Sequence, residues 1–536
     1  MNSKEILKFC LEKGMLVDNE VLNLFNDSED IESIKLIIEK IKSYTKNSVI
    51  TKNVLSDNKE QVNKFFLDLP KESQKKLERF KIKLGLSIQI SKEISTPIIP
   101  DQDIINILHH PIVNEKNKSF NSKIDEDVKI ISTSHLQSKK LEVGDFVNYF
   151  RGRLVKMKEI LQERPELNQL ISINKISGNR QGISIIGMVA DKKITKNKNI
   201  LLEVEDLTGK IKVIINRNKP EIYEKAEDIA LDSVLAFKGS GSREIFFAND
   251  LIFPEAMIQE RKKSYVEEYV LFIGDMHVGS KLFLEKNFLK FIDYLNGKIP
   301  NTPEVEKIKY LFIVGDSVAG VGIYPEQEKE LEIKDFEGQF EKLAEILSKI
   351  RRDIKIIICP GNHDGIRIME PQPLPDEKYA WPLYNLKNVI LIENPFQVNI
   401  GAKKDFSGFN VLVYHGYSYH YYANNIPRLM KEKAVHTPDK LMHYLLKNRH
   451  LAPSHSSTLY FPSNDDALMI KDIPDIFVSG HTHKSAVSYY NNILTISVST
   501  WESKTPFQER MGNEPDFCKI PMFNLKTRAV KILDFE

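Results

Sequence analysis

Strand-like runs of mostly apolar residues, each with a glycine within two residues of its end, recur through the second half of the chain. The first run covers residues 269–273 and leads into Gly274, and further runs cover 310–314, 355–359, 410–414 and 473–478. An uninterrupted apolar run of this length predicts a strand that is buried on both faces. In sheets of such strands, functional groups are presented by the loops beyond the carboxyl ends. The residues directly after each run are therefore the first candidates for a functional site.

Each run leads into side chains that can bind metal ions. A single Gly-Asp after a strand is usually a turn, and an isolated His-x-His pair is ambiguous. The joint pattern has little chance of arising from unrelated turns. Mixed oxygen and nitrogen ligands suit Mn²⁺, Fe²⁺ or Zn²⁺ better than Ca²⁺ or Mg²⁺. The residues in question are Asp275, His277, Asp316, Asn362, His363, Asp364, His415, His481 and His483.

Together these motifs resemble the motif set of the calcineurin-like metallophosphoesterases. The resemblance covers roughly residues 265–536 and rests on Asp275-x-His277, Gly315-Asp316, Gly361-Asn362-His363-Asp364, His415-Gly416 and Gly480-His481-x-His483. It implies a β-sandwich flanked by helices, with two divalent metal ions at the strand ends. Manganese is the expected ion, with iron or zinc as alternatives. The resemblance implies that one ion is held by Asp275, His277, Asp316 and His483, and the other by Asp316, Asn362, His415 and His481.

The same resemblance implies hydrolysis of phosphodiesters. Two ions about 3.5–4 Å apart acidify a water between them and neutralise charge on the phosphoryl oxygens. His363 is not placed as a ligand, and is expected to contact the scissile phosphate and protonate the leaving oxygen. Asp364 is expected to hold the tautomer of His363 and raise its basicity.

The preceding segments predict a multidomain α+β protein. Residues 1–90 carry apolar side chains such as Ile6, Phe9 and Cys10 at helical spacing, which predicts a small helical head. Residues 91–144 have the composition of a flexible linker. Residues 145–168 predict a connecting helix whose basic residues Arg151, Arg153, Lys156 and Lys158 are solvated.

Residues 169–258 are rich in strand patterns and resemble an OB-fold β-barrel. Residues 206–210, Asp-Leu-Thr-Gly-Lys, predict a hairpin turn. The segment lacks a clear stripe of aromatic and basic residues. We therefore expect an interface within the chain or with a partner, in preference to primary DNA binding. Residues 262–536 form the predicted nuclease domain.

Composition sets further limits. The 536 residues carry a net charge of only +2, so any contact with nucleic acid is expected to be local. No apolar run approaches the roughly 18–20 residues of a membrane span. The first residues do not resemble a signal peptide, and the three cysteines are scattered. These features predict a cytoplasmic protein that does not contact membranes.

The order of head, linker, barrel and phosphoesterase resembles the small subunits of archaeal D-family DNA polymerases. Residues 500–512 also resemble the C-terminal stretch of that family. The resemblance implies a 3′–5′ exonuclease that proofreads at the primer 3′ end for a separate large catalytic subunit. The related B-subunits of eukaryotic polymerases have lost metal ligands, whereas this chain keeps each one. A non-catalytic scaffold subunit and a stand-alone DNA repair nuclease of the same superfamily remain as alternatives.

An aromatic cluster follows His415. It contains Tyr417 and Tyr419, with Arg428 a few residues further on. Aromatic faces stack on unpaired bases without reading sequence. We therefore predict that Tyr417, Tyr419 and Arg428 bind the terminal nucleotide. The alternative is that these rings pack under the site or face another subunit.

Overall fold

The computed structural model describes residues 2–18, 21, 35, 38–39, 49–50, 128–130, 140–178 and 180–536. The chain divides into two units, Met1–Pro100 and Asp101–Glu536, and each is described by itself.

In the first unit, helix α1 (Asn2–Glu12) precedes strand β1 (Leu16–Val17), which pairs in parallel with β2 (Val49–Ile50). This strand pair was not predicted. The buried side chains lie at predicted apolar positions, namely Ile6, Cys10, Met15, Val21 and Ile38. A second predicted helical stretch, residues 61–84, lies outside the described residues.

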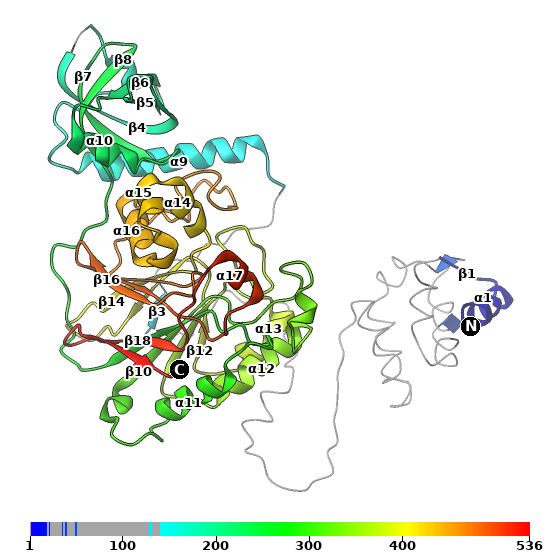
Figure 1. The fold of residues 1–536 in the computed structure, drawn as a ribbon. Helices are drawn as coiled ribbons and strands as arrows, with labels where there is room; N and C mark the ends of the chain where they lie inside the picture. The colour runs from blue at the N-terminus through cyan, green and yellow to red at the C-terminus, as the bar shows by residue number, and fades with distance from the viewer. Residues whose placement is uncertain are drawn as a thin grey trace. The chain divides into compact units, whose positions relative to one another are not determined.

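The second unit contains two six-stranded sheets (Figure 1). The first sheet has the order β12-β11-β10-β9-β18-β19. Its strands β9 to β12 are mutually parallel, and β18 and β19 add an antiparallel edge. The bounds are β9 (Tyr269–Ile273), β10 (Ile308–Val314), β11 (Lys355–Cys359), β12 (Val389–Leu391), β18 (Lys519–Asn524) and β19 (Val530–Asp534).

The second sheet has the order β16-β17-β15-β14-β13-β3. The bounds are β3 (Val128–Ile130), β13 (Phe396–Ile400), β14 (Phe409–Tyr414), β15 (Ile476–Ser479), β16 (Ala486–Tyr490) and β17 (Ile493–Ser497). Strand β3 lies inside the segment predicted to be a flexible linker. The structure differs there because β3 pairs with the edge strand β13 and buries Val128.

The two sheets pack face to face as a sandwich. Alternate residues of each strand point to opposite faces. In β9, Val270 and Phe272 join the core between the sheets, whereas Leu271 and Ile273 face the helices outside. Helices α11 (Glu285–Leu295), α12 (Phe336–Ser348) and α13 (Glu377–Tyr384) cover the first sheet, and α14 (Tyr419–Asn425), α15 (Pro427–Lys431) and α16 (Pro438–Asn448) cover the second. A short helix, α17 (Pro506–Met511), follows the last strand of the second sheet. We call residues 262–536 the sandwich domain.

A closed five-stranded barrel precedes the sandwich domain, with the strand order β4-β5-β6-β8-β7. The bounds are β4 (Arg180–Ile194), β5 (Ile200–Asp206), β6 (Gly209–Ile215), β7 (Val234–Gly241) and β8 (Ile245–Ile252), with α10 (Pro220–Glu227) between β6 and β7. The predicted hairpin turn is present between β5 and β6. There the Asp206 carboxylate accepts hydrogen bonds from the backbone N–H groups of Thr208 and Gly209. The assignment of this barrel as an OB-fold stays a prediction.

Helix α9 (Val143–Gln162) is the predicted connecting helix. Its residues Leu154, Met157 and Leu161 pack against the barrel. Arg153 was predicted to be solvated, and this is wrong. Its side chain is 2% exposed, and its Nε donates to Asp466 of the sandwich domain at 2.8 Å.

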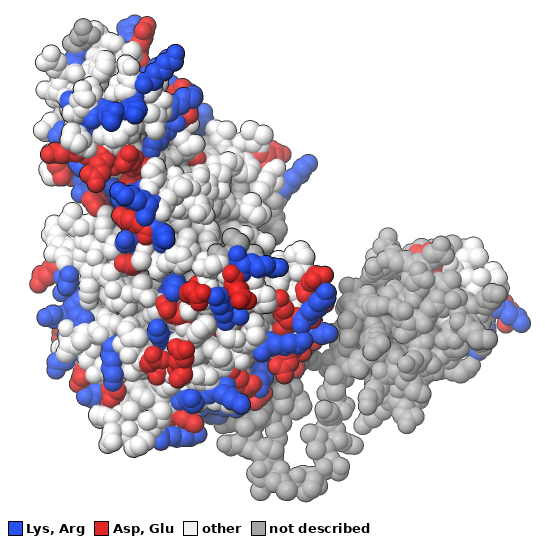
Figure 2. All heavy atoms as spheres, viewed as in Figure 1, with Lys and Arg blue, Asp and Glu red and all other residues white. Residues whose placement is uncertain are grey.

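On the face that Figure 2 shows, acidic and basic side chains of the described residues are interspersed and neither sign dominates. This distribution agrees with the small net charge of the chain. Within the part of the chain that the structure describes, no helix is long and apolar enough to cross a membrane.

Candidate metal centre

The predicted ligands come from the ends of five strands. Asp275 and His277 follow β9, Asp316 follows β10 and Asn362 follows β11, all in the first sheet. His415 follows β14, and His481 and His483 follow β15, both in the second sheet. The sandwich therefore brings ligands from both sheets to one place.

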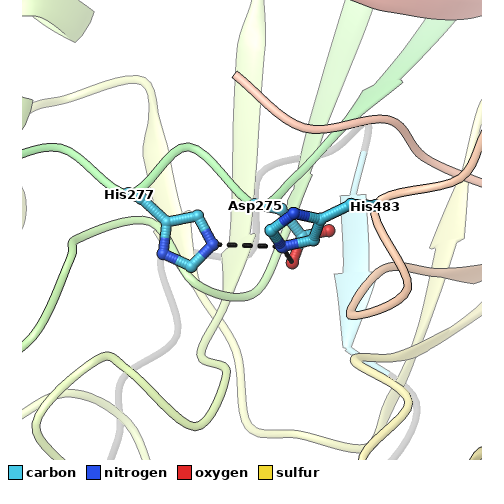
Figure 3. A group of neighbouring side chains, drawn as sticks. All are labelled: Asp275, His277 and His483. Carbon is cyan, nitrogen blue, oxygen red and sulfur yellow. Dashed lines mark hydrogen bonds and ion pairs between the residues drawn. The ribbon is translucent and has the colours of Figure 1, made fainter. Parts of the chain in front are cut away.

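The first group of side chains is Asp275, His277 and His483. Figure 3 shows the three side chains pointing toward one another. The Nε2 atoms of His277 and His483 are 3.2 Å apart, and Nε2 of His483 lies 3.6 Å from the carboxylate of Asp275. All three residues are buried.

The second group is Asp316, His415 and His481, with Asn362 beside it. Nε2 of His415 lies 3.2 Å from Oδ2 of Asp316 and 3.1 Å from Oδ1 of Asn362. Nδ1 of His481 lies 3.3 Å from the same nitrogen of His415. Carboxylate, carboxamide and imidazole atoms thus converge around one position.

Asp316 connects the two groups. It clusters with His277 and His363 as well as with His415 and His481, with the candidate ligand atoms of each cluster within 4.8 Å of one another. Because several lone pairs point into a small buried space, the donor set fits cations. Mixed nitrogen and oxygen donors suit first-row transition ions. The structure therefore contains a His/Asp cluster that could hold metal, and all seven predicted ligands lie in or beside it.

The backbone at this centre is unusual. Five of the candidate ligand residues have positive φ values: Asp275 48°, His277 50°, Asp316 47°, His481 68° and His483 55°. Non-glycine residues held in this region cost on the order of 1–3 kcal/mol each and tend to cluster at functional sites. A Cβ atom on Gly361 would lie 2.2 Å from Oδ1 of Asp316. The glycine next to Asn362 is therefore required for the close approach of the two loops.

Burial and mutual charges set the protonation of these groups. Burial lowers the pKa of His277 and His481 well below the usual value, and lowers the pKa of His483 to about 4. Burial opposes ionisation of Asp316, but the neighbouring His415 outweighs it and holds the pKa of Asp316 well below its usual range. The converse holds for His415, where burial lowers the pKa but Asp316 raises it to about 10. At neutral pH the Asp316 carboxylate is therefore ionised and His415 is protonated beside it, whereas His277, His481 and His483 are neutral.

His363 and Asp364 are in the loop after β11, but the predicted contact between them is replaced by others. Nδ1 of His363 lies 2.8 Å from the carbonyl oxygen of Ala319. The Asp364 carboxylate accepts hydrogen bonds from the backbone N–H groups of Val318 and Gly361, at 3.0 and 2.6 Å. The prediction that Asp364 orients His363 is therefore corrected. Asp364 fixes the loops, because its oxygens are engaged by backbone donors, and the Ala319 carbonyl orients His363.

The pocket at this centre does not include Tyr417, Tyr419 or Arg428. Tyr419 is 1% exposed and packs in the core under the second sheet, which argues against the predicted substrate contact. Arg428 is bound to Asp228 of the segment between α10 and β7, at 3.0 Å. The ring of Tyr417 contacts His481 with 5.6 Å between centroids. Residues 419–425 form helix α14, whose spacing turns Tyr419 and Tyr422 into the core.

The pocket has a volume of ≈ 250 Å³, and several of its residues were not predicted. Gln508 on α17 is one of them, and its Nε2 lies 2.8 Å from Nδ1 of His483. These residues lie on loops and short helices without ligand-type patterns, so no local signal singled them out. The unpredicted lining residues include Tyr324, Glu330, His420, His436, Glu502 and Gln508.

Comparison with known proteins defines the family. The family described as the DNA polymerase alpha/epsilon B-subunit matches residues 270–488. The DNA polymerase II small subunit of Methanothermobacter thermautotrophicus is 36% identical over 417 residues, which are 77% of this chain and 83% of that protein. The chain belongs to the family of DNA polymerase II small subunits, the archaeal D family.

Other members of the small-subunit family align over similar stretches. The Pyrococcus horikoshii small subunit is 35% identical over 88% of this chain and 73% of its own length. The Pyrococcus furiosus small subunit is 38% identical over 73% of this chain, but the match spans only 64% of its own length.

Solved structures share a remote likeness with this small-subunit chain. A novel archaeal phosphodiesterase is 12% identical and covers 49% of this chain and 98% of its own, with a TM-score of 0.25. The zinc complex of Vps29 from Entamoeba histolytica is 14% identical and covers 50% of this chain and 99% of its own, with a TM-score of 0.22. Likenesses of this degree do not bear on function.

Proposed function

We propose that this small subunit is a 3′–5′ exonuclease that hydrolyses DNA phosphodiesters with two divalent metal ions. The observation that supports the proposal is that Asp316, which lines the pocket, clusters with His277 of the first group and with His415 and His481 of the second. Asp275, His277, Asp316 and His483 would hold one ion, and Asp316, Asn362, His415 and His481 the other. When bound, two such ions acidify a water and neutralise charge on the phosphoryl oxygens. Manganese is our preferred ion, with iron or zinc as alternatives.

The side chains around the candidate ligands have separate roles in binding substrate and in positioning the site. His363 presents Nε2 toward the ligands, 3.9 Å from Oδ2 of Asp316, because its Nδ1 is held by Ala319. From there His363, in its doubly protonated imidazolium form, would contact the scissile phosphate and give its Nε2 proton to the leaving oxygen. Gln508 holds the ring of His483. Asp364 keeps the loops after β10 and β11 together.

The partners follow from the same proposal. A protein named as a small subunit of a polymerase has a large catalytic subunit, and we propose that this chain assembles with one. A proofreading subunit acts on a primer 3′ end that has left its template. Unpairing costs least at a mismatch, which biases such a site toward errors. The barrel, as a proposed OB-fold, is then an interface for the partner or for the sandwich domain.

The proposal is tested with the purified chain, alone and with its large subunit. A 5′-labelled single-stranded oligonucleotide, a duplex with a 3′-terminal mismatch and the matched duplex are each incubated with Mn²⁺. We expect stepwise shortening of the labelled strand from its 3′ end, faster in the mismatched than in the matched duplex. Shortening from the 5′ end contradicts the polarity. No hydrolysis by the complex with Mn²⁺, Fe²⁺ or Zn²⁺ would favour the scaffold alternative, which the complete set of ligands now argues against.

A further inference from the structure

A tyrosine that lines the pocket has no role in the chemistry proposed above. We propose that Tyr324 is the platform on which the unpaired terminal base of the DNA strand stacks. The inference rests on the proposed function, because it assigns a binding residue for the substrate of that site. Tyr324 takes the place of Tyr419 as the proposed stacking residue, because the Tyr419 side chain is buried in the core.

The ring of Tyr324 is available and held in place. Its side chain is 39% exposed and lines the pocket together with His277, Asp316 and His363. Its hydroxyl group donates to the carboxylate of Glu330 at 2.7 Å. A ring that is anchored at its hydroxyl end loses little conformational freedom when a second ring stacks on its face.

The loop that carries Tyr324 is fixed by two buried glutamines. Gln327 accepts a hydrogen bond from the backbone N–H of Ile323 at 2.9 Å and donates to the Ala319 carbonyl at 2.9 Å. Gln339 accepts from the N–H of Gly320 at 2.9 Å and donates to the Ile333 carbonyl at 2.8 Å. The platform is therefore part of a rigid loop and not of a mobile one.

The same loop also determines where His363 lies. The carbonyl of Ala319 accepts from Gln327 and also lies 2.8 Å from Nδ1 of His363. The position of the Tyr324 ring is thus tied through a few bonds to the residue that faces the scissile phosphate. A base that is stacked on Tyr324 would place its own nucleotide at a defined distance from His363.

The size and chemistry of the pocket favour a single nucleotide. Small-molecule pockets run to about 300–1,000 Å³, and this pocket of ≈ 250 Å³ is close to the lower limit. A space of this size favours a single nucleotide unit over a base pair. An aromatic face holds each of the four bases, which suits an enzyme that must remove any mismatched end.

Binding of two oligonucleotides that differ only in the base of the 3′-terminal residue tests the inference. The probes are a single-stranded oligonucleotide with a normal 3′ end and the same oligonucleotide with an abasic 3′-terminal residue. Affinity is measured by fluorescence anisotropy on the complex with the large subunit, with Ca²⁺ replacing Mn²⁺. The variants are Tyr324→Leu and Tyr324→Phe. Tyr384→Leu is the matched control, because Tyr384 is also 39% exposed and its hydroxyl group is also hydrogen-bonded, but it is not among the pocket residues.

We expect Tyr324→Leu to weaken binding of the normal end by about 5- to 150-fold and to leave the abasic end unchanged. Tyr324→Phe keeps the ring and should stay close to the parent, as should Tyr384→Leu. The inference is overturned if Tyr324→Leu binds the normal end like the parent, or weakens both ends equally. The proposed function fails separately, if the complex binds the base through Tyr324 but hydrolyses no DNA with any of the expected ions.

Discussion

Nδ1 of His363 lies 2.8 Å from the carbonyl oxygen of Ala319. A carbonyl oxygen only accepts hydrogen bonds, so Nδ1 carries the proton and the ring is held with Nε2 toward the ligand groups. The ring is therefore oriented by backbone and not by a carboxylate. His363 is therefore expected to act on the substrate through Nε2, whereas the candidate ligands hold the metal ions.

We expect His363→Ala to lower kcat by about 10²–10⁴-fold while the chain keeps its metal ions. His363→Asn is the informative companion, because an asparagine amide can still donate to the Ala319 carbonyl but has no counterpart of Nε2. Both variants should be inactive with a normal metal content, measured by elemental analysis after dialysis. Metal loss in step with activity would instead make His363 a ligand.

Asp316 should be the most sensitive single ligand. Its carboxylate takes part in clusters with His277 and with His415, so its loss affects both ion positions. We expect Asp316→Ala to abolish nuclease activity and to bind less than one ion per chain, whereas loss of an outer ligand such as His483 should leave one position occupied. Titration of the apo protein with Mn²⁺ by calorimetry measures both. Asp293→Ala, at an exposed pair with Lys298, is the control. Two ions retained with normal turnover would rule out the bridging role.

Gln508 should act on metal affinity through His483. Its carbonyl oxygen accepts the N–H of Thr505 at 3.0 Å, while its Nε2 lies 2.8 Å from Nδ1 of His483. Partners that accept the N–H of a ligating histidine typically contribute about 10–100-fold in metal affinity or activity. The Nε2 of Gln508 is instead a donor, which leaves the ring proton of His483 on Nε2. We therefore expect Gln508→Ala to keep or raise the affinity for Mn²⁺.

Two further variants separate this role from a general effect on α17. Gln508→Glu keeps the capping box with Thr505, and its second carboxylate oxygen can accept a hydrogen bond from Nδ1–H of His483, which frees Nε2 for the metal. Its Mn²⁺ affinity should exceed that of the parent by about 10–100-fold. Glu509→Ala changes the next residue of the same helix and should leave affinity unchanged. If Gln508→Glu binds Mn²⁺ no better than Gln508→Ala, the position serves the fold of α17 and not the ligand.

The ligand set could be predicted because its signal is local. Each apolar run that ends beside Asp275, Asp316 or His415 is buried on both faces in the structure. A few consecutive residues are therefore enough to predict both a buried strand and the position where it ends. The glycines carry the same kind of information. Gly361 adjoins Asn362 because a Cβ atom there would strike Asp316.

Contacts made by tertiary packing left no such signal. Gln508 follows His483 by 25 residues, and Tyr324 comes from a loop with no ligand motif. Tyr419 was assigned by composition, and the helical spacing of α14 turned it inward. Arg153 is on a helix with several solvated basic residues, and only the packing against Asp466 distinguishes it. Contacts between residues on different helices, strands and loops become visible only in the three-dimensional structure.

Glu370 gives the last prediction, which concerns stability and pH. The side chain is fully buried, and its Oε2 accepts hydrogen bonds from the hydroxyl groups of Thr458 at 3.0 Å and Tyr414 at 3.3 Å. Burial outweighs these bonds and raises the pKa of Glu370 to about 8. Between the ordinary glutamate pKa of about 4.3 and this value, the folded chain binds one more proton than the unfolded chain. The contribution of Glu370 to stability is therefore fully present below the lower value and is lost as pH rises through the upper one.

Glu370→Gln isolates this contribution, because glutamine has nearly the same shape and does not titrate. We expect the free energy of unfolding of the parent, minus that of Glu370→Gln, to fall with pH by at most about 1.4 kcal/mol per unit between pH 5 and 8, and to level off above. Urea denaturation of both proteins at pH 5.5, 6.5, 7.5 and 8.5 gives this difference, and other titrating groups cancel in it. The exposed Glu509→Gln should show no such trend. A difference that stays constant over the four pH values would mean that Glu370 is ionised in the folded protein, and that Tyr414 and Thr458 stabilise its charge in spite of burial.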